Sequence, residues 1–163
     1  MEAIVDQLSD YELEPRRRTG GKPIPDTIHA AIQSNLLFEL KLRYREQYRS
    51  LSELSLATVP DGTTPDVAIY PAFPLDYDHR TPRRADPPLA CIEIQSPSQS
   101  NEEMVNKTGI YFAFGVKSCW IVVPAMRGIF VYDQPGHYTF FHGDDTLHDD
   151  ILGIDLPLSA IFE

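Results

Sequence analysis

The sequence has 163 residues, the length of one ordinary domain, and its 42% hydrophobic and 23% charged residues are typical of a globular protein. The formal net charge of −10 excludes a protein that is basic overall, and the sequence holds neither a charged-then-apolar leader nor an apolar run of membrane-spanning length. We therefore expect one domain over residues 1–163, located in the cytoplasm and without a membrane partner.

The charge is distributed unevenly along the chain. Residues 1–84 hold 11 basic and 13 acidic side chains, whereas residues 85–163 hold 3 basic and 11 acidic ones. Because proteins gain affinity for DNA mainly by neutralising phosphates with Lys and Arg, a DNA-binding surface would have to come from the first half. The candidates are Arg16–Arg18 with Lys22, the cluster of Arg43, Arg45 and Arg49, and the pair Arg83 and Arg84. Each of them, taken alone, is better explained as a solvated surface run.

The first predicted element is a helix over residues 27–48, with Asp26 as its N-cap. Its apolar residues recur at helical spacing on one broad face, with a histidine beside them: Ile28, Ile32, Leu36, Leu40 and His29. Glu39 and Arg43 fall on the same face, four residues apart. They are interpreted either as a mutually satisfied ion pair or as the end of a helix that overhangs a polar cleft.

Three strands follow this helix in the predicted order. Residues 51–59 and 65–70 read as strands, and a long loop rich in Pro, Arg and Asp covers residues 71–88. Residues 89–95 are nearly all apolar, which is typical of a central strand buried on both faces.

A second helix begins after Ser100, which forms a capping box with Glu103, and it ends near Phe114 before Gly115. The remaining predicted segments are a buried strand at 119–123, hairpin strands at 128–132 and 137–141, an acidic loop at 142–150, and an apolar tail at 151–162 that packs under the sheet. Cys91 and Cys119 lie in apolar strands without metal-ligand spacing and are expected to be free thiols. This order of elements favours an α/β fold with a mixed β-sheet flanked by helices.

Glu93 is the candidate functional residue with the clearest signal. It is the one carboxylate in the apolar strand 89–95, and a carboxylate is costly to bury without a cation or a hydrogen-bond donor. Strand alternation places Glu93 on the same face as Cys91 and Gln95. The alternative is a glutamate on the solvent face of an amphipathic strand.

Asp66 and Lys107 complete a possible catalytic set. Asp66 opens the strand 65–70, and alone it is best explained as a strand-entry residue. Together with Glu93 on a neighbouring strand, however, it can share an ion such as Mg²⁺, which prefers carboxylates, waters and phosphate oxygens. Lys107 falls at the edge of the inward face of the second helix, from which it can reach over the strand end, and the alternative is a surface pair with Glu103.

Several short motifs distributed over most of the chain carry a resemblance to a known family. They are Tyr11-Glu12-Leu13, His29, Thr64–Tyr70, Ile92–Ser98, Lys107 with Tyr111, Gly115-Val116, Trp120–Val122 and Gly153–Phe162. Together they resemble the Uma-type family of bacterial restriction endonucleases, which are relatives of the PD-(D/E)xK nucleases.

The resemblance implies a restriction-endonuclease-like fold and the metal-dependent hydrolysis of phosphodiester bonds in DNA. It implies Asp66 and Glu93 as ligands of Mg²⁺ or Mn²⁺, and a homodimer as the active form. In the wider superfamily a lysine follows the glutamate by two residues, but Gln95 occupies that position here. The family's lysine appears in the following helix, which points to Lys107. Gln95 and Ser96 would then support the site or contact substrate, and His29 either lines the cleft or is structural.

Two other functions stay open at this stage. The chain could be a catalytically silent nuclease-fold module that binds nucleic acid or a protein partner, or an interaction module whose acidic second half docks a basic partner. The intact set of Asp66, Glu93 and Lys107 favours the nuclease, whereas the net charge favours the interaction module. Geometry can separate them, because a nuclease needs both carboxylates within reach of one ion with the lysine beside them.

Overall fold

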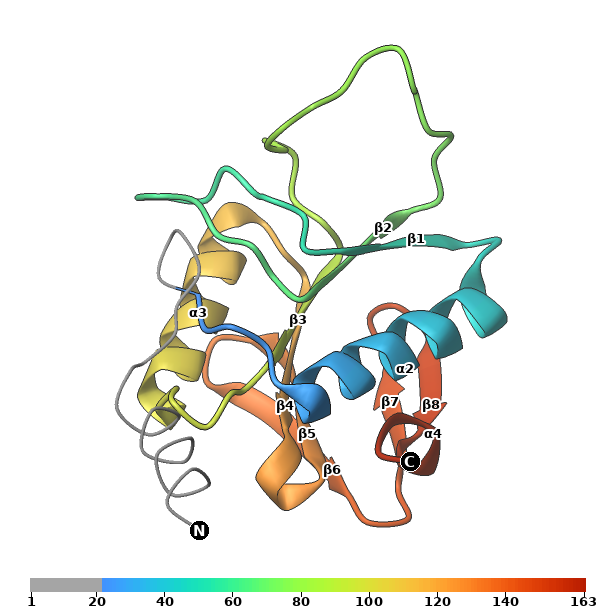
Figure 1. Cartoon of the computed structure of the whole chain (residues 1–163), viewed down its shortest axis with the longest axis vertical. Coiled ribbons are helices and arrows are strands. Elements are labelled where there is room, and N and C mark those ends of the chain that lie inside the picture. Colours follow the sequence, from blue (N-terminus) through green and yellow to red (C-terminus); the bar gives the residue numbers. More distant parts are fainter. Residues whose placement is uncertain (1–21) are drawn as a thin grey trace, which may run out of the picture.

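A computed structural model describes residues 22–163, and its centre is a mixed six-stranded sheet in the order β1-β2-β3-β4-β5-β6 (Figure 1). The strands of this sheet are β1 Tyr48–Ser52, β2 Val67–Pro71, β3 Ala90–Ile94, β4 Ser118–Val123, β5 Gly128–Gln134 and β6 His137–His142. The other elements are the helices α2 Thr27–Tyr44, α3 Asn101–Phe114 and α4 Leu158–Ile161, a 3₁₀ turn at Pro124–Met126, and the two strands of a small second sheet, β7 Thr146–Asp149 and β8 Ile154–Pro157. This arrangement is the mixed sheet with flanking helices that the sequence predicts.

The described sheet is antiparallel at every strand pair except β3 with β4. A parallel pair needs a crossover connection, and α3 provides it. Cys91 and Cys119 lie opposite each other in this pair, and both are buried and free, as the sequence predicts.

Two hydrophobic clusters cover the two faces of the sheet. On one face α2 packs with the small sheet and α4 against alternate strand residues, among them Ile92 and Ile94. On the other face Met104 and Tyr111 of α3 pack against a cluster that includes Cys91. Because side chains alternate along a strand, Glu93 points toward α3, and the predicted division of this strand into two faces is confirmed.

The start of α2 is confirmed, but its end and the following strand are not where the sequence predicts them. The Asp26 side chain accepts a hydrogen bond from the His29 N–H at 2.8 Å, as an N-cap does. The helix ends at Tyr44, and β1 begins at Tyr48, where antiparallel pairing with β2 outweighs helical periodicity. The predicted strand 51–59 is therefore wrong beyond Ser52. Of the apolar residues predicted to form one face of this helix, only Ile28 is exposed.

The predicted acidic loop at 142–150 is also wrong, because Thr146–Asp149 forms β7 and pairs with β8. The buried Asp149 explains why this segment forms a strand, since its carboxylate accepts hydrogen bonds from Ser118 Oγ at 2.6 Å and Trp120 Nε1 at 2.8 Å. The apolar tail packs into the core beside α2, as predicted.

The connection between β2 and β3 contains no helix or strand (Figure 1), only an isolated bridge between Arg84 and Leu56, which confirms the predicted long loop. Arg84 anchors it, because its guanidinium lies 4.2 Å from the ring centroid of Tyr70 and forms an ion pair with Asp86 at 2.6 Å. Within residues 22–163, the helices are all too short or too polar to cross a membrane.

Candidate active site

Asp66 and Glu93 lie side by side where β2 begins and β3 ends. The antiparallel register pairs Val67 with Ile92. Asp66, which precedes Val67, therefore lies opposite Glu93, which follows Ile92. Asp66 is 0% and Glu93 2% exposed, and both line one small cavity of about 10 Å³. Two carboxylates buried together repel each other, so the site requires positive charge.

The surroundings of Asp66 supply that charge from α2 and from the segment before it. Oδ2 accepts a hydrogen bond from the Ile94 N–H at 2.7 Å. Oδ1 lies 2.8 Å from Lys22 Nζ and 3.1 Å from His29 Nε2. Burial acts to raise the pKa of Asp66, but His29 and Lys22 outweigh it and hold this pKa below its ordinary value. The contacts to Oδ1 are close but poorly directed, so within residues 22–163 this buried oxygen has no well-formed hydrogen bond.

The partners of Glu93 come from α3. Tyr111 donates a hydrogen bond to Oε1, and Lys107 Nζ donates to Oε2 at 3.2 Å. Burial raises the pKa of Glu93, and the charge of Asp66 acts in the same direction against the opposing effect of Lys107. The structure thus brings Asp66, Glu93 and Lys107 together. The ion pair of Lys107 within the described chain is with Glu93 and not with Glu103.

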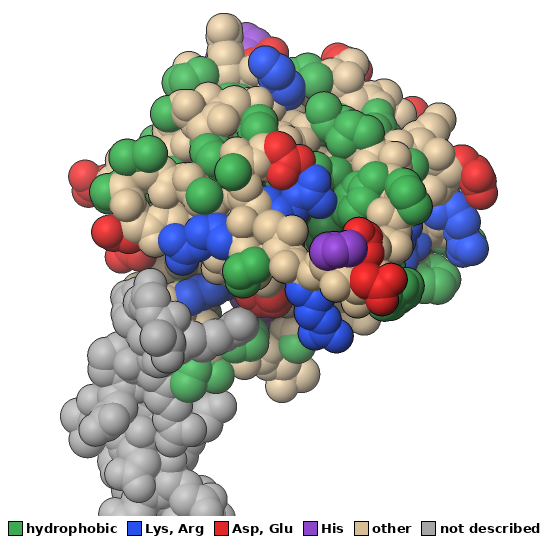
Figure 2. All heavy atoms as spheres, turned by 90° about the horizontal axis from the view of Figure 1, so that it is seen from above, with side chains coloured by type: hydrophobic (Ala, Val, Ile, Leu, Met, Phe, Trp, Pro, Cys, Tyr) green, Lys and Arg blue, Asp and Glu red, His purple; other side chains and the backbone are tan. Residues whose placement is uncertain are grey.

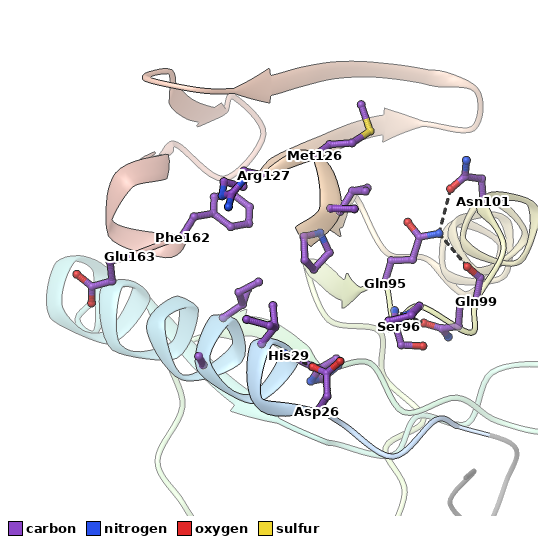
Figure 3. A pocket seen from close by; sticks show the side chains of 17 residues that line it. Asp26, His29, Gln95, Ser96, Gln99, Asn101, Met126, Arg127, Phe162 and Glu163 are labelled. Carbon is purple, nitrogen blue, oxygen red and sulfur yellow. Dashed lines mark hydrogen bonds between the residues drawn. The ribbon is translucent and has the colours of Figure 1, made fainter. Parts of the chain in front are cut away.

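The three supporting residues expected from the sequence lie at different distances from this centre. His29 contacts Asp66, and its buried Nδ1 has no hydrogen-bond partner among residues 22–163. Ser96 lines the small cavity. Gln95 instead donates hydrogen bonds to the Gln99 carbonyl at 3.0 Å and to Asn101 Oδ1 at 2.9 Å (Figure 3), and it does not line the small cavity.

A larger pocket of about 730 Å³ adjoins the site between the start of α2 and the turn after β4 (Figure 3). It shares His29, Ser96 and Gln99 with the small cavity. Its walls are mainly apolar, with Met126 and Phe162 among them, and Arg127 adds a cation. A pocket of this volume and character is suited to a small organic group.

Sequence reasoning missed the role of two residues. Lys22, grouped there with Arg16–Arg18, which lie outside the described residues, has a side chain only 14% exposed. Burial opposes its charge, but Asp66 and Glu93 raise the pKa of Lys22 overall. Glu53, placed inside a predicted strand, follows β1 with φ at 54° and accepts a hydrogen bond from Lys22 at 2.9 Å. No sequence pattern indicates that this glutamate adopts a left-handed backbone conformation.

The donor set fits a hard divalent ion. Mg²⁺ prefers carboxylate oxygens, and Asp66 Oδ1 is a buried carboxylate oxygen without a well-formed hydrogen bond. Within residues 22–163 no three His, Cys, Asp or Glu side chains gather closely enough to hold a metal by themselves. Asp66 and Glu93 would therefore share the coordination of an ion with water and substrate oxygens.

The face of the molecule on the side of the long loop is mixed in charge. Seen from the side of the long loop, basic, acidic and apolar side chains are interleaved (Figure 2). Of the predicted basic candidates, Arg43 pairs with Glu39 at 2.8 Å and Arg84 with Asp86. Lys41, Arg45 and Arg49 line a hollow of about 380 Å³, and none of the three has an acidic partner among residues 22–163.

Comparison with solved structures defines the fold class. The chain is similar to the crystal structure of a putative nuclease belonging to DUF820 from Anabaena variabilis ATCC 29413, with a TM-score of 0.75 and 22% sequence identity over 87% of this chain and 84% of that chain. The fold is therefore nuclease-like and α/β. A search of curated proteins gave no match.

The family model named Uma2, described as "Putative restriction endonuclease", matches residues 9–159. The chain belongs to this family, and the resemblance drawn from the sequence motifs is confirmed.

Proposed function

We propose that this protein is a metal-dependent endonuclease that hydrolyses phosphodiester bonds of DNA. Asp66 and Glu93 would bind Mg²⁺ or Mn²⁺, and Lys107 would be the catalytic cation. The observation that carries the proposal is the pair of buried carboxylates. Burying two acidic side chains next to each other costs free energy, and the fold does not need such a pair for its own stability. Membership of a restriction endonuclease family supports both the chemistry and the substrate.

Each residue has a part that follows from its contacts. A divalent ion bound here would activate water and neutralise charge on the phosphate. The Ile94 N–H fixes one oxygen of Asp66 and Tyr111 fixes one oxygen of Glu93, so both ligands are held in position before substrate arrives. The Lys107 side chain is 24% exposed, and its ammonium can turn from Glu93 to a phosphate oxygen and stabilise the charge that develops there.

The neighbouring pocket and the basic hollow would accommodate other parts of the substrate. The pocket begins at His29 and Ser96, next to the carboxylates, and Gln95 lines it as a possible substrate contact. Lys41, Arg45 and Arg49 would contact the phosphate backbone farther along the duplex, since phosphate contacts position DNA without reading its sequence.

The direct test combines metal binding with cleavage. Mg²⁺ and Mn²⁺ are titrated by calorimetry into the wild type, Glu93→Gln and the exposed control Glu102→Gln, and the same samples are assayed for plasmid nicking. We expect Glu93→Gln to lose both metal binding and nicking, and Glu102→Gln to keep both. A wild type that binds neither ion at millimolar concentration would overturn the proposal.

A catalytically silent module that binds nucleic acid or a protein is the second candidate. It is favoured by the small volume of the cavity, about 10 Å³, which is at the lower limit for a single water. DNA binding without nicking at any metal concentration would support this candidate.

We also expect one domain and a homodimer, in which two sites would act on the two strands of a duplex. Sedimentation velocity at micromolar concentration tests the oligomeric state, and a monomer in the presence of DNA would contradict the expectation.

A further inference from the structure

Lys22 lies where the candidate site most needs positive charge. Its ammonium is 2.8 Å from Asp66 Oδ1 and donates hydrogen bonds to Glu53 Oε2 at 2.9 Å and to the Thr64 carbonyl at 2.8 Å. Three oxygens from three different residues thus surround one nitrogen. An ammonium has three donors and no acceptor. Glu53 and Thr64 accept two hydrogen bonds from it, and Asp66 Oδ1 lies within ion-pair distance of the same nitrogen.

We propose that Lys22 is the internal counter-ion of the site: its ammonium holds Asp66 in the metal-free protein, and a divalent ion binds Asp66 only by displacing it. The inference rests on the proposed function, because it assumes that Asp66 is a metal ligand. It adds a residue that tunes the affinity of the site for its ion.

Space makes the two cations mutually exclusive. The cavity between Lys22, His29, Asp66 and Glu93 has a volume of about 10 Å³, which leaves no room for an ion with its waters. The Lys22 ammonium already contacts Asp66 Oδ1, the oxygen that lacks a well-directed hydrogen bond. An ion that binds this oxygen must therefore take the volume that the ammonium fills.

The other cations near the carboxylates cannot serve as the displaceable counter-ion of Asp66. Lys107 reaches the site from α3, and its ammonium donates a hydrogen bond to Glu93 Oε2 and forms its ion pair among residues 22–163 with Glu93 and not with Asp66. His29 lies 3.1 Å from Asp66 Oδ1, but it is fixed in the first turn of α2 and is itself buried. Lys22 precedes α2 and belongs to no helix or strand, so its side chain can withdraw without moving one of these elements.

Removal of the lysine charge tests the proposal directly. Mn²⁺ affinity is measured by calorimetry for the wild type, Lys22→Met, Lys22→Arg and Lys117→Met, the last being a control that removes one positive charge at the opposite end of the β3–β4 pair. We expect Lys22→Met to bind Mn²⁺ about tenfold more tightly, as befits the loss of one competing charge in a partly buried site. Lys22→Arg and Lys117→Met should stay within about threefold of the wild type.

The possible outcomes separate this inference from the proposed function. Equal or weaker Mn²⁺ binding by Lys22→Met, with normal binding by the wild type, would overturn the role of Lys22 and leave the metal site standing. No binding by any of the four proteins would overturn both.

A second measurement on the wild type needs no substitution. The Lys22 amine is labelled by reductive methylation with and without saturating Mn²⁺, and its labelling is compared by mass spectrometry with that of Lys117. Displacement by the ion should raise the labelling of Lys22 relative to Lys117. Unchanged or reduced labelling would contradict displacement, even if Lys22→Met failed to fold.

Discussion

Replacement of Glu93 by Gln should stabilise the metal-free protein while it removes metal binding. The substitution keeps the shape of the side chain and a hydrogen-bond acceptor for Tyr111, but it removes a charge that is 2% exposed. Burial raises the pKa of Glu93 because it disfavours the charged carboxylate. A neutral amide avoids this cost in free energy. The variant loses the ion pair with Lys107, whose side chain is 24% exposed, so this loss is small after solvent screening.

The net gain should be about 1 kcal/mol in the free energy of unfolding, within the range commonly found for a single stabilising substitution. For a domain of this length it corresponds to a rise in melting temperature of roughly 2–4 °C. Urea unfolding of both proteins in EDTA, followed by circular dichroism, measures it.

Asp149 provides the matched comparison, since it is a buried carboxylate with a structural role. It accepts hydrogen bonds from the side chains of Ser118 and Trp120 and from the Ile151 and Leu152 N–H groups. Asp149→Asn should therefore lower the free energy of unfolding by about 2 kcal/mol or more. If Glu93→Gln destabilised the protein as much, Glu93 would be a structural residue like Asp149, and the argument for a functional site would fail.

Three further predictions concern other parts of the molecule. Tyr111→Phe should leave nicking measurable but lower it about tenfold, because Glu93 loses the hydroxyl that orients it, and single-turnover rates check this. The double change Lys41→Gln with Arg45→Gln should weaken DNA binding equally for all sequences and reduce the salt slope by up to about 2, as measured by fluorescence anisotropy. Gly115→Ala should lower the free energy of unfolding by about 1 kcal/mol in urea titrations, because Gly115 has φ at 112° and an added Cβ would lie 3.1 Å from Pro87 Cγ.

Local signals were sufficient to predict the central part of the fold. The capping box at Ser100 and the stop at Gly115 bound α3 closely, and an apolar run with one acid identified β3. These features depend on neighbouring residues, which the sequence displays directly. Glu93 was found because a charge inside an apolar strand is unusual wherever the strand lies. Asp66 became a candidate only together with Glu93, since alone it is best explained as a strand-entry residue.

Features that depend on distant partners were not predictable in this way. β7 lies in an acidic segment, and it forms because Asp149 meets Ser118 and Trp120 from the main sheet. The approach of Lys22 to Asp66 depends on a path of the chain that no local pattern specifies. Gln95 shares a strand face with Glu93, yet the turn into α3 directs it toward Asn101.

The two carboxylates receive their partners from opposite layers of the molecule. Those of Glu93 come from α3 on one face of the sheet, whereas those of Asp66 come from the first turn of α2, which packs on the other face, and from the segment before it. A chain in which only one helix has docked therefore possesses half of the arrangement. Completion of both layers around the sheet becomes a condition for assembling the site. Under the proposed nuclease function, an incompletely folded or newly synthesised chain would not cleave the nucleic acid around it.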